Sequence, residues 1–335
     1  MKQTATAPAF SVVIPLFNKE ATVERALRSV ICQTDQAFEI IVVDNGSTDR
    51  SLDAAQAVRD IRLRVVREEE PGVSTARNRG IGESRGAWIA FLDADDEWEA
   101  DHLETLSTLR EDHPDCSVVA TRYLLGMEGE GTRPAIVNGL AEDWSGLLAD
   151  YFAVAARSDP PLWTSAVAVE RRAIKAVGLF PVGVTAGEDL LIWARLAVRY
   201  PIAYSMKTTA IFWREPACIH SGRPTRVPDR DDLVGRGLQS LLLECRPGQR
   251  AGIKKYLALW HKMRASIYMR LGRRTESSIE TLKAIRYDPL AWKLYAYLLL
   301  AHCPSSIQRR VFRDWGSHRW RTEGAALPPS PVQRE

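Results

Sequence analysis

Three carboxylates follow a short apolar run in the segment FLDADDEW, residues 91–98. The run ends at Leu92, and Asp93, Asp95 and Asp96 come directly after it. So much negative charge in one place costs free energy unless a cation or hydrogen bonds compensate for it. Carboxylate oxygens suit Mg²⁺ or Mn²⁺, which in turn bridge the oxygens of a diphosphate. An acidic helix N-terminus would use the same residues, but the end of a buried strand favours a metal site.

A second polar turn follows another apolar run, in the segment VVDNGSTDRS. Asp44 ends the run, Gly46 permits a tight turn, and Ser47 or Thr48 is a suitable cap for a following helix. A carboxylate at this place accepts hydrogen bonds from the base or ribose of a nucleotide. An ordinary strand-to-helix turn explains the same residues equally well.

Elements that would position these residues alternate along the first hundred residues. Short apolar runs bounded by turn residues predict strands at Phe10–Ile14, Phe38–Val43, Ile61–Val66 and Ala87–Leu92. Apolar residues at three- to four-residue spacing predict helices at Glu20–Cys32, Thr48–Val58 and Ser74–Ser84. Strand-helix alternation indicates a parallel, doubly wound sheet, which binds ligands beyond the carboxyl ends of its strands.

The rest of the chain has two further patterns. Strands are expected at Cys116–Leu124, Ser165–Val169, Ile202–Ser205 and Ala210–Trp213, and helices at Asp231–Cys245, Gly248–Leu271, Thr275–Tyr287 and Leu290–His302. We therefore expect a flexible N-terminus at 1–9, a main domain at 10–230, a helical C-terminal region at 231–323 and a disordered tail at 324–335.

Composition narrows the class of protein. The 335 residues carry a net charge of only +3, which argues against a nucleic-acid partner. Five scattered cysteines without C-x-x-C spacing indicate reduced thiols in the cytoplasm. We recognise no signal peptide, and no stretch supplies the roughly 20 apolar residues of a membrane span.

Five segments in order, SVVIPLFNKE, IIVVDNGSTD, PGVSTARNRGI, FLDADDEW and GEDLLIWARL, resemble glycosyltransferase family 2. The resemblance covers about residues 10–219. It implies a GT-A fold, an α/β doubly wound mixed sheet with helices on both faces, to which the C-terminal helices are an appendage. It also implies a nucleotide-diphosphate sugar donor, with UDP as the default, a divalent Mn²⁺ or Mg²⁺ cofactor, and inversion at the anomeric carbon.

The resemblance also assigns roles by position. The nucleotide-sugar site would comprise Pro15, Phe17, Glu20, Asp44, Ser47, Arg77, Asn78, Asp93 and Ala94. Asp95 matches the metal-binding carboxylate of the D-x-D motif. His220 would be a second metal or diphosphate ligand, although it lies further from Trp213 than the family's spacing. Asn45 and Ala100 depart from the family, where aspartate and proline are common.

The segment GEDLLIWARL supplies the expected catalytic base. Asp189 matches its position, and burial beside Glu188 would raise the pKa of Asp189 and strengthen it as a proton acceptor. Glu188 would bind the acceptor or support the base. Two acids capping a helix would look the same, but the upstream motifs favour the base. Trp98 would stack on the acceptor sugar or pack inside the protein.

The basic segment Ser305–Trp315 places Ile307, Val311, Phe312 and Trp315 on one helical face. This pattern indicates a helix at an anionic membrane surface or one packed on the other helices. Together with the resemblance it predicts a cytoplasmic enzyme, peripheral at the inner face of the membrane. Its acceptor would be a glycan or lipid-linked hydroxyl in cell-surface polysaccharide or lipopolysaccharide synthesis.

Three other classes of protein share some of these features. A dinucleotide-binding oxidoreductase needs a glycine-rich turn after the first strand, where Pro15-Leu16-Phe17-Asn18 contains no glycine. A sugar-nucleotide nucleotidyltransferase shares much of the fold and the metal but wants a glycine-rich triphosphate loop. A catalytically inactive scaffold is disfavoured because Asp44, Asp93, Asp95 and Asp189 are all present.

Overall fold

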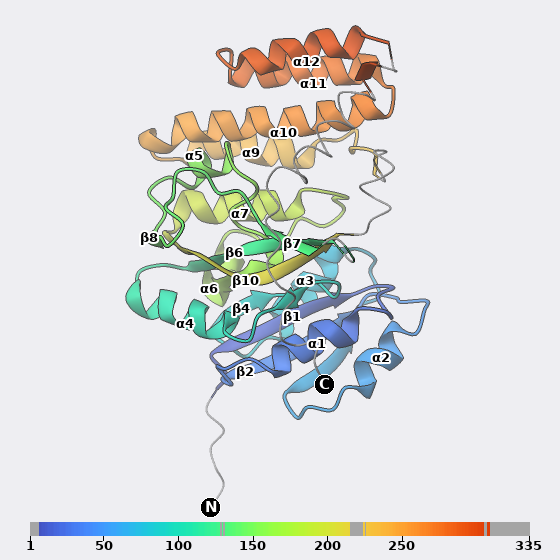
Figure 1. Cartoon of the computed structure of the whole chain (residues 1–335), viewed down its shortest axis with the longest axis vertical. Helices are drawn as coiled ribbons and strands as arrows, with labels where there is room; N and C mark the ends of the chain where they lie inside the picture. Colours follow the sequence, from blue (N-terminus) through green and yellow to red (C-terminus); the bar gives the residue numbers. More distant parts are fainter. Residues whose placement is uncertain are drawn as a thin grey trace, which may run out of the picture. The chain divides into compact units, whose positions relative to one another are not determined.

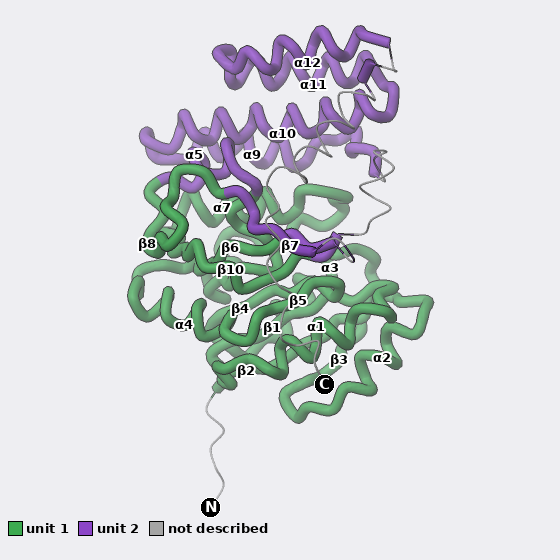
Figure 2. Tube along the Cα trace, in the orientation of Figure 1, with its two compact units in different colours: residues 1–124, 137–149, 160–212 green, residues 125–136, 150–159, 213–335 purple. Residues whose placement is uncertain are grey.

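The computed structural model describes residues 7–127, 129, 131–214, 224, 226–304, 307 and 308. The chain forms two compact units, drawn in green and purple in Figure 2. The first comprises residues 1–124, 137–149 and 160–212, and the second comprises residues 125–136, 150–159 and 213–335. Neither unit is continuous in sequence. The domain limits expected from the sequence, 10–230 and 231–323, stay a prediction.

Four parallel strands form one half of the sheet in the first unit (Figure 1). They are β1 (Phe10–Leu16), β2 (Phe38–Asp44), β3 (Leu63–Arg67) and β4 (Trp88–Phe91), in the order β3-β2-β1-β4. The connecting helices are α1 (Val23–Ile31), α2 (Ser51–Ala57) and α3 (Val73–Glu83). All seven elements end within three residues of the predicted limits. β1 and β2 are buried almost throughout, as expected for parallel strands covered on both faces.

The other half of the sheet is antiparallel. It continues from β4 through β9 (Val167–Glu170), β6 (Val118–Met127), β10 (Ile202–Arg214) and β5 (Glu97–Trp98). Two short strands, β7 (Gly131–Pro134) and β8 (Ser145–Leu147), pair with β6 and β10. The helices of this half are α4 (His102–Asp112), α6 (Arg171–Ala176) and α7 (Glu188–Arg199). The sheet is therefore mixed, as the expected GT-A fold requires.

One expectation about the strands was wrong. The sequence indicated two strands, 202–205 and 210–213, but β10 runs unbroken through both. The polar residues Lys207, Thr208 and Thr209 interrupt the apolar pattern without interrupting the strand. Thr209 is buried and donates to Thr121 on β6, so a polar residue here serves sheet packing.

The carboxyl ends of β2, β1 and β4 meet at one edge of the sheet. The backbone N–H of Asn45 donates to Leu16 O, and that of Leu92 donates to Val13 O. Helix α3 lies close beneath, because Gly80 has no side chain: a Cβ there would come 2.3 Å from Val13 Cγ1. The sequence therefore brings α3 and the three strand ends into one place.

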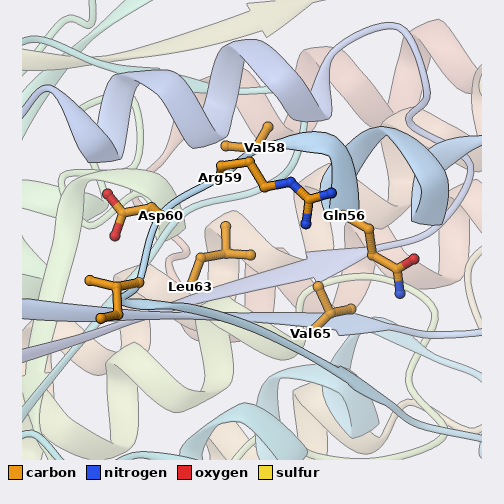
Figure 3. A pocket seen from close by; sticks show the side chains of 7 residues that line it. Gln56, Val58, Arg59, Asp60, Leu63 and Val65 are labelled. Atoms are coloured by element: carbon orange, nitrogen blue, oxygen red, sulfur yellow. The ribbon is translucent and has the colours of Figure 1, made fainter.

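A shallow hollow lies elsewhere, beside the edge strand β3 (Figure 3). Its volume is about 730 Å³ and it is open to solvent. The residues that line it are Gln56, Val58, Arg59, Asp60, Ile61, Leu63 and Val65. They come from the end of α2, the turn that follows it and the first half of β3, whereas the predicted site residues follow the carboxyl ends of strands. This hollow therefore does not coincide with the predicted site.

The second unit is helical. It contains α5 (Tyr151–Ala155), α9 (Leu233–Glu244), α10 (Arg250–Arg270), α11 (Arg274–Tyr287) and α12 (Trp292–His302). The last four lie within two residues of the predicted helices, and α10 packs against α9, α11 and α5. The predicted basic helix, 305–315, lies outside the described residues except for Ile307 and Gln308. Within the described part of the chain, no helix is long and apolar enough to span a bilayer.

Buried charges join α10, α11 and the start of α9. Asp232, His261 and Glu280 offer ligand atoms within 4.8 Å of one another, a spacing compatible with a metal ion. However, the guanidinium of Arg264 lies 3.3 Å from Glu280 and 3.6 Å from Asp232. Lys283 also pairs with Glu280. These cations already compensate the carboxylates, so the cluster is an internal ion-pair network.

Glu280 makes this network a source of acid sensitivity. Burial alone would raise the pKa of Glu280, but hydrogen bonds from His261 and Lys283 and the charge of Arg264 lower it to about 2. Because its ordinary pKa is 4.5, Glu280 stabilises the fold above that pH and loses this contribution as the pH falls from 4.5 towards 2.

We predict that Glu280→Gln lowers the free energy of unfolding at pH 7 by about 3 kcal/mol, because Arg264 is left buried beside a neutral partner. Urea unfolding followed by circular dichroism measures the change. Glu276→Gln on the same helix is the control and should cost less than about 0.5 kcal/mol. The variant should also lose the stability difference between pH 7 and pH 3 that Glu280 supplies. Equal unfolding midpoints for both variants would contradict the prediction.

Candidate active site

The loops after β1 and β4 are joined by an ion pair. Lys19 follows β1, and its Nζ lies 2.6 Å from Asp95 Oδ2 in the loop after β4. The backbone carbonyl of Asp95 accepts a hydrogen bond from Arg25 on α1. Both side chains of the pair are about one-third exposed. The Asp95 carboxylate therefore faces an accessible place that already attracts a cation.

A buried arginine joins the loop after β4 to the first turn of α7. Arg77 on α3 is 3% exposed. Its guanidinium donates to Asp93 Oδ1 at 2.8 Å and to Glu188 Oε1 at 3.0 Å. Although burial disfavours the charged form, these carboxylates raise the pKa of Arg77 above its ordinary value. The guanidinium of Arg77 therefore joins two carboxylates, Asp93 and Glu188, that are far apart in sequence.

The first turn of α7 is positioned by its entry loop. Gly187, with φ of 85°, is in the left-handed conformation directly before Glu188. Further upstream, Asn78 holds the backbone of Phe180: its amide donates to Phe180 O at 2.8 Å and accepts from Phe180 N at 3.0 Å. The Phe180 ring packs edge-on against Phe91 of β4. The entry loop is thus fixed to both α3 and β4.

Asp189 has an unusual protonation equilibrium. Burial, the charge of Glu188 and, less strongly, the charge of Asp93 raise the pKa of Asp189 to about 7, although Arg77 and the Leu190 N–H oppose the rise. The described hydrogen bond to its carboxylate comes from Leu190 N at 2.7 Å, within its own helix turn. A carboxylate with this pKa takes up a proton near neutral pH far more readily than an ordinary aspartate. Asp189 therefore has the properties of a general base.

Asp96, the third acid of the motif, points into the protein. It is 1% exposed, and its Oδ2 accepts hydrogen bonds from Ser165 Oγ at 2.5 Å and Trp163 Nε1 at 3.3 Å. Burial raises the pKa of Asp96 well above its ordinary value, and the charges of Asp93 and Asp95 add to the effect. Asp96 thus anchors the loop, and the outward-facing carboxylates are Asp93 and Asp95.

The loops after β1 and β2 interlock. Thr48 N donates to Asn18 Oδ1 at 2.8 Å, and Arg50 N donates to Glu20 Oε2 at 2.9 Å. Ser47 Oγ accepts from Asn18 N, and Ser47 N donates to Asp44. Asp44 is 5% exposed at the end of β2, whereas Phe17 is 56% exposed. Pro15, Phe17, Glu20, Asp44 and Ser47 are therefore brought to one edge of the sheet, and their role in nucleotide binding stays a prediction.

Asn45 explains one departure from the family pattern. Its amide Nδ2 donates to Glu68 O and Glu70 O, and its Oδ1 accepts from Gly72 N. A carboxylate has no hydrogen to donate to the two carbonyls. The asparagine therefore ties the turn after β2 to the loop that precedes α3.

The contacts and exposure of three other predicted residues bear on their expected roles. The side-chain amide of Asn78 bonds to the backbone of Phe180, which gives Asn78 a positioning role, and its place in the nucleotide pocket stays a prediction. Trp98 is 3% exposed and donates to Ser165 O, which favours the packing alternative over stacking on a sugar. Ala94 is 2% exposed, which leaves only its backbone available to a ligand. His220 lies outside the described residues.

Two contacts of the site were missed in the sequence. Lys19 belongs to the segment SVVIPLFNKE, but no sequence pattern predicts that it pairs with Asp95. Trp163 is partly exposed, bonds to Asp96, and its indole contacts the rings of Tyr123 and Phe212 at centroid distances of 5.5 and 4.2 Å. An accessible aromatic side chain beside the acidic loop was expected at position 98, whereas the structure has Trp98 buried and Trp163 partly exposed.

Comparison with known proteins agrees with this arrangement. Residues 11–174 match the model of "Glycosyl transferase family 2". Among curated relatives, the putative glycosyltransferase EpsH of Bacillus subtilis is 36% identical over 126 residues, 37% of this chain and 36% of EpsH. A PGL/p-HBAD biosynthesis glycosyltransferase of Mycobacterium bovis is 38% identical over 117 residues, 34% of this chain and 46% of that protein. The matches thus span less than half of each relative.

Solved structures extend the likeness of fold to nearly the whole chain. Staphylococcus aureus TarS 1–349, in complex with UDP-GlcNAc, has a TM-score of 0.65 at 18% identity, covering 96% of this chain and 94% of that one. The mannosyltransferase PcManGT of Pyrobaculum calidifontis, in complex with GDP-Man and Mn²⁺, has a TM-score of 0.55 at 18% identity, covering 95% and 89%. The fold is the GT-A fold of nucleotide-sugar transferases. Residues 11–174 form a glycosyltransferase family 2 domain, as the motifs predicted.

We predict that Asn45→Asp destabilises the protein by about 2 kcal/mol, because a carboxylate would face the carbonyls of Glu68 and Glu70 without a hydrogen to donate. Thermal unfolding followed by circular dichroism measures the change. Asn18→Asp is the matched control, since the described side-chain bonds of Asn18 use its oxygen alone. A smaller loss for Asn45→Asp than for the control would contradict the proposed tie.

Proposed function

We propose that this chain is an inverting glycosyltransferase that moves a sugar from a UDP-sugar to a hydroxyl of a glycan or lipid-linked acceptor. The observation that carries the proposal is the Arg77 ion-pair network, which joins the first turn of α7, where Asp189 lies, to Asp93 in the D-x-D loop. Transfer between two bound substrates needs a base near the acceptor hydroxyl and carboxylates near the donor.

The proposed reaction assigns a task to each part of the site. Asp189 takes the proton of the acceptor hydroxyl as its oxygen attacks the anomeric carbon, on the side opposite to the departing nucleoside diphosphate. Glu188 and Asp93 keep Arg77 charged and in place, and Arg77 moderates the pKa of Asp189. Asp44, Phe17 and Glu20 would hold the nucleoside at the ends of β1 and β2.

The residues present fit a divalent cation. Asp95 offers a hard oxygen ligand, is partly exposed, and already has the ammonium of Lys19 against it. Asp93, two residues away, offers a second carboxylate whose Oδ1 is held by Arg77. When bound at Asp95, Mn²⁺ or Mg²⁺ would neutralise charge on the departing diphosphate. His220 stays a proposed additional ligand.

The relatives support the finer parts of this proposal by analogy. TarS was solved with UDP-GlcNAc and PcManGT with GDP-Man and Mn²⁺, which supports a nucleotide-diphosphate sugar and a metal here. The mycobacterial relative is named for the biosynthesis of PGL/p-HBAD. We therefore propose a place in cell-surface polysaccharide or lipopolysaccharide synthesis, with the enzyme at the cytoplasmic face of the membrane.

We predict that Asp189→Asn lowers kcat at least about 100-fold while nucleotide affinity changes less than about twofold, because the amide cannot accept the acceptor's proton. Nucleoside diphosphate release across an acceptor panel measures turnover, and calorimetry measures affinity. Asp53→Asn, which alters an acid in the first turn of α2, is the control and should leave both unchanged. Equal kcat in Asp189→Asn and wild type would exclude Asp189 as the base.

The raised pKa of Asp189 sets the expected pH dependence. Since the base works only when deprotonated, kcat should fall about tenfold per pH unit below pH 7 and level off above it. The ordinary aspartate pKa of 3.8 would place the fall near pH 4 instead. A pH–rate profile between pH 4 and 9, at saturating donor and acceptor, decides between these two cases.

We predict that one of UDP, GDP and dTDP binds in the presence of Mn²⁺, and that chelation or Asp95→Ala weakens its binding at least about tenfold. Isothermal titration calorimetry measures each combination. Asp101→Ala is a matched control, because Asp101 has a similar exposure and also pairs with a lysine. Binding of no nucleotide would favour a scaffold, and release of pyrophosphate from a sugar phosphate and nucleoside triphosphate would favour a nucleotidyltransferase.

A further inference from the structure

Large apolar side chains are exposed on the last two described helices of the second unit. They are Ile279 and Leu282 on α11, Leu290 in the turn, and Trp292, Tyr295 and Leu299 on α12, with exposed fractions between 45 and 91%. We call these six residues the outer surface. Such a grouping is unusual for a protein surface that faces water alone.

The outer surface follows the periodicity of the helices. Trp292, Tyr295 and Leu299 are spaced by three and four residues, and so share one face of α12. The opposite face carries the buried residues Leu294, Tyr297 and Ala301. Two faces of the same helix are therefore apolar, one covered by the protein and one uncovered within the described residues.

α11 repeats this arrangement. Its buried face contacts α10 through Ser277, which donates to Ala265 O, and Glu280, which bonds to His261. Ile279 and Leu282 are half-exposed on the other side. By helical spacing, both residues lie on the side of α11 opposite to Ser277 and Glu280.

The charges around the outer surface have one sign. Between residues 271 and 302 the exposed charged side chains are those of Arg273, Arg274, Lys283, Arg286 and Lys293. The acids of this stretch are less accessible: Glu280 is buried, and Glu276 and Asp288 are partly buried. Lys293 Nζ lies 6.0 Å from the Trp292 ring centroid. Exposed tryptophan, tyrosine and leucine among cations match the interface of an anionic bilayer. Aromatic rings bind favourably at the level of the headgroups, and basic side chains are attracted to the anionic lipid phosphates.

We propose that the outer surface of α11 and α12 binds the surface of an anionic membrane. Trp292 and Leu299 enter the boundary between headgroups and acyl chains, while Arg286 and Lys293 contact lipid phosphates. A protein partner with an apolar patch would not account for five exposed cations without an equally exposed acid. The inference concerns the second unit and does not rest on the proposed transferase activity.

The test uses the full chain and sedimentation with sucrose-loaded vesicles. Vesicles of phosphatidylglycerol and phosphatidylcholine should bind the wild type at least about tenfold more strongly than phosphatidylcholine alone, and added salt should weaken the binding. The double variant Trp292→Glu/Leu299→Glu should lose at least about tenfold in affinity. Leu243→Glu is the matched control, since Leu243 on α9 is 89% exposed outside the outer surface, and it should bind like the wild type.

A second measurement keeps the result interpretable if the double variant is unstable. Bromine-labelled anionic lipid should quench tryptophan fluorescence in the wild type, and Trp292→Phe should remove part of that quenching without losing vesicle binding. Nucleotide binding and circular dichroism, measured on the same samples, separate membrane binding from the proposed activity and from folding.

Three outcomes would overturn the proposal. The first is no binding of the wild type to anionic vesicles. The second is unchanged binding by the double variant, which would assign membrane contact to another part of the chain. The third is a change from oligomer to monomer in the double variant without vesicle binding by the wild type, which would assign the outer surface to contact between copies.

Discussion

Negative charge at the end of β4 and at the start of α7 is tolerated because Arg77 lies between them. Asp93, Glu188 and Asp189 would repel one another in an interior of low dielectric, and removing the arginine would leave Glu188 buried without compensation. The position of Arg77 depends in turn on Gly80, whose missing side chain lets α3 approach β1. The arrangement of the candidate site therefore depends on a close helix–strand contact about one helical turn away from the arginine.

Different surroundings explain how the acids of the candidate site acquire different properties. Asp96 is buried against Ser165 and Trp163, so its neutral form is favoured, whereas Asp95 is about one-third exposed and paired with Lys19. At Asp189, burial raises the pKa while Arg77 limits the rise. The loop anchor Asp96, the Lys19-paired Asp95 and the proposed base Asp189 thus differ in environment and not in side-chain chemistry.

The strands and helices were predictable because their apolar residues follow local periods, as in β2 and α1. The site was predictable as a set of loops, since motif order places them at the carboxyl ends of neighbouring strands. Its contacts were not predictable: Arg77 and Glu188 are 111 residues apart, and no local pattern pairs them. Likewise, Trp98 and Trp163 are both tryptophans near the acidic loop, and only packing shows that Trp98 is the buried one.

The hydrogen bonds of Asn45 also bear on how this domain is recombined with its relatives. The amide of Asn45 joins the turn after β2 to the backbone of residues 68–72. The turn and residues 68–72 therefore form one structural unit. A chimera that took the first segment from a relative with aspartate and kept the second would combine incompatible halves. Exchange boundaries for such chimeras belong before β2 and after Gly72, with both segments transferred together.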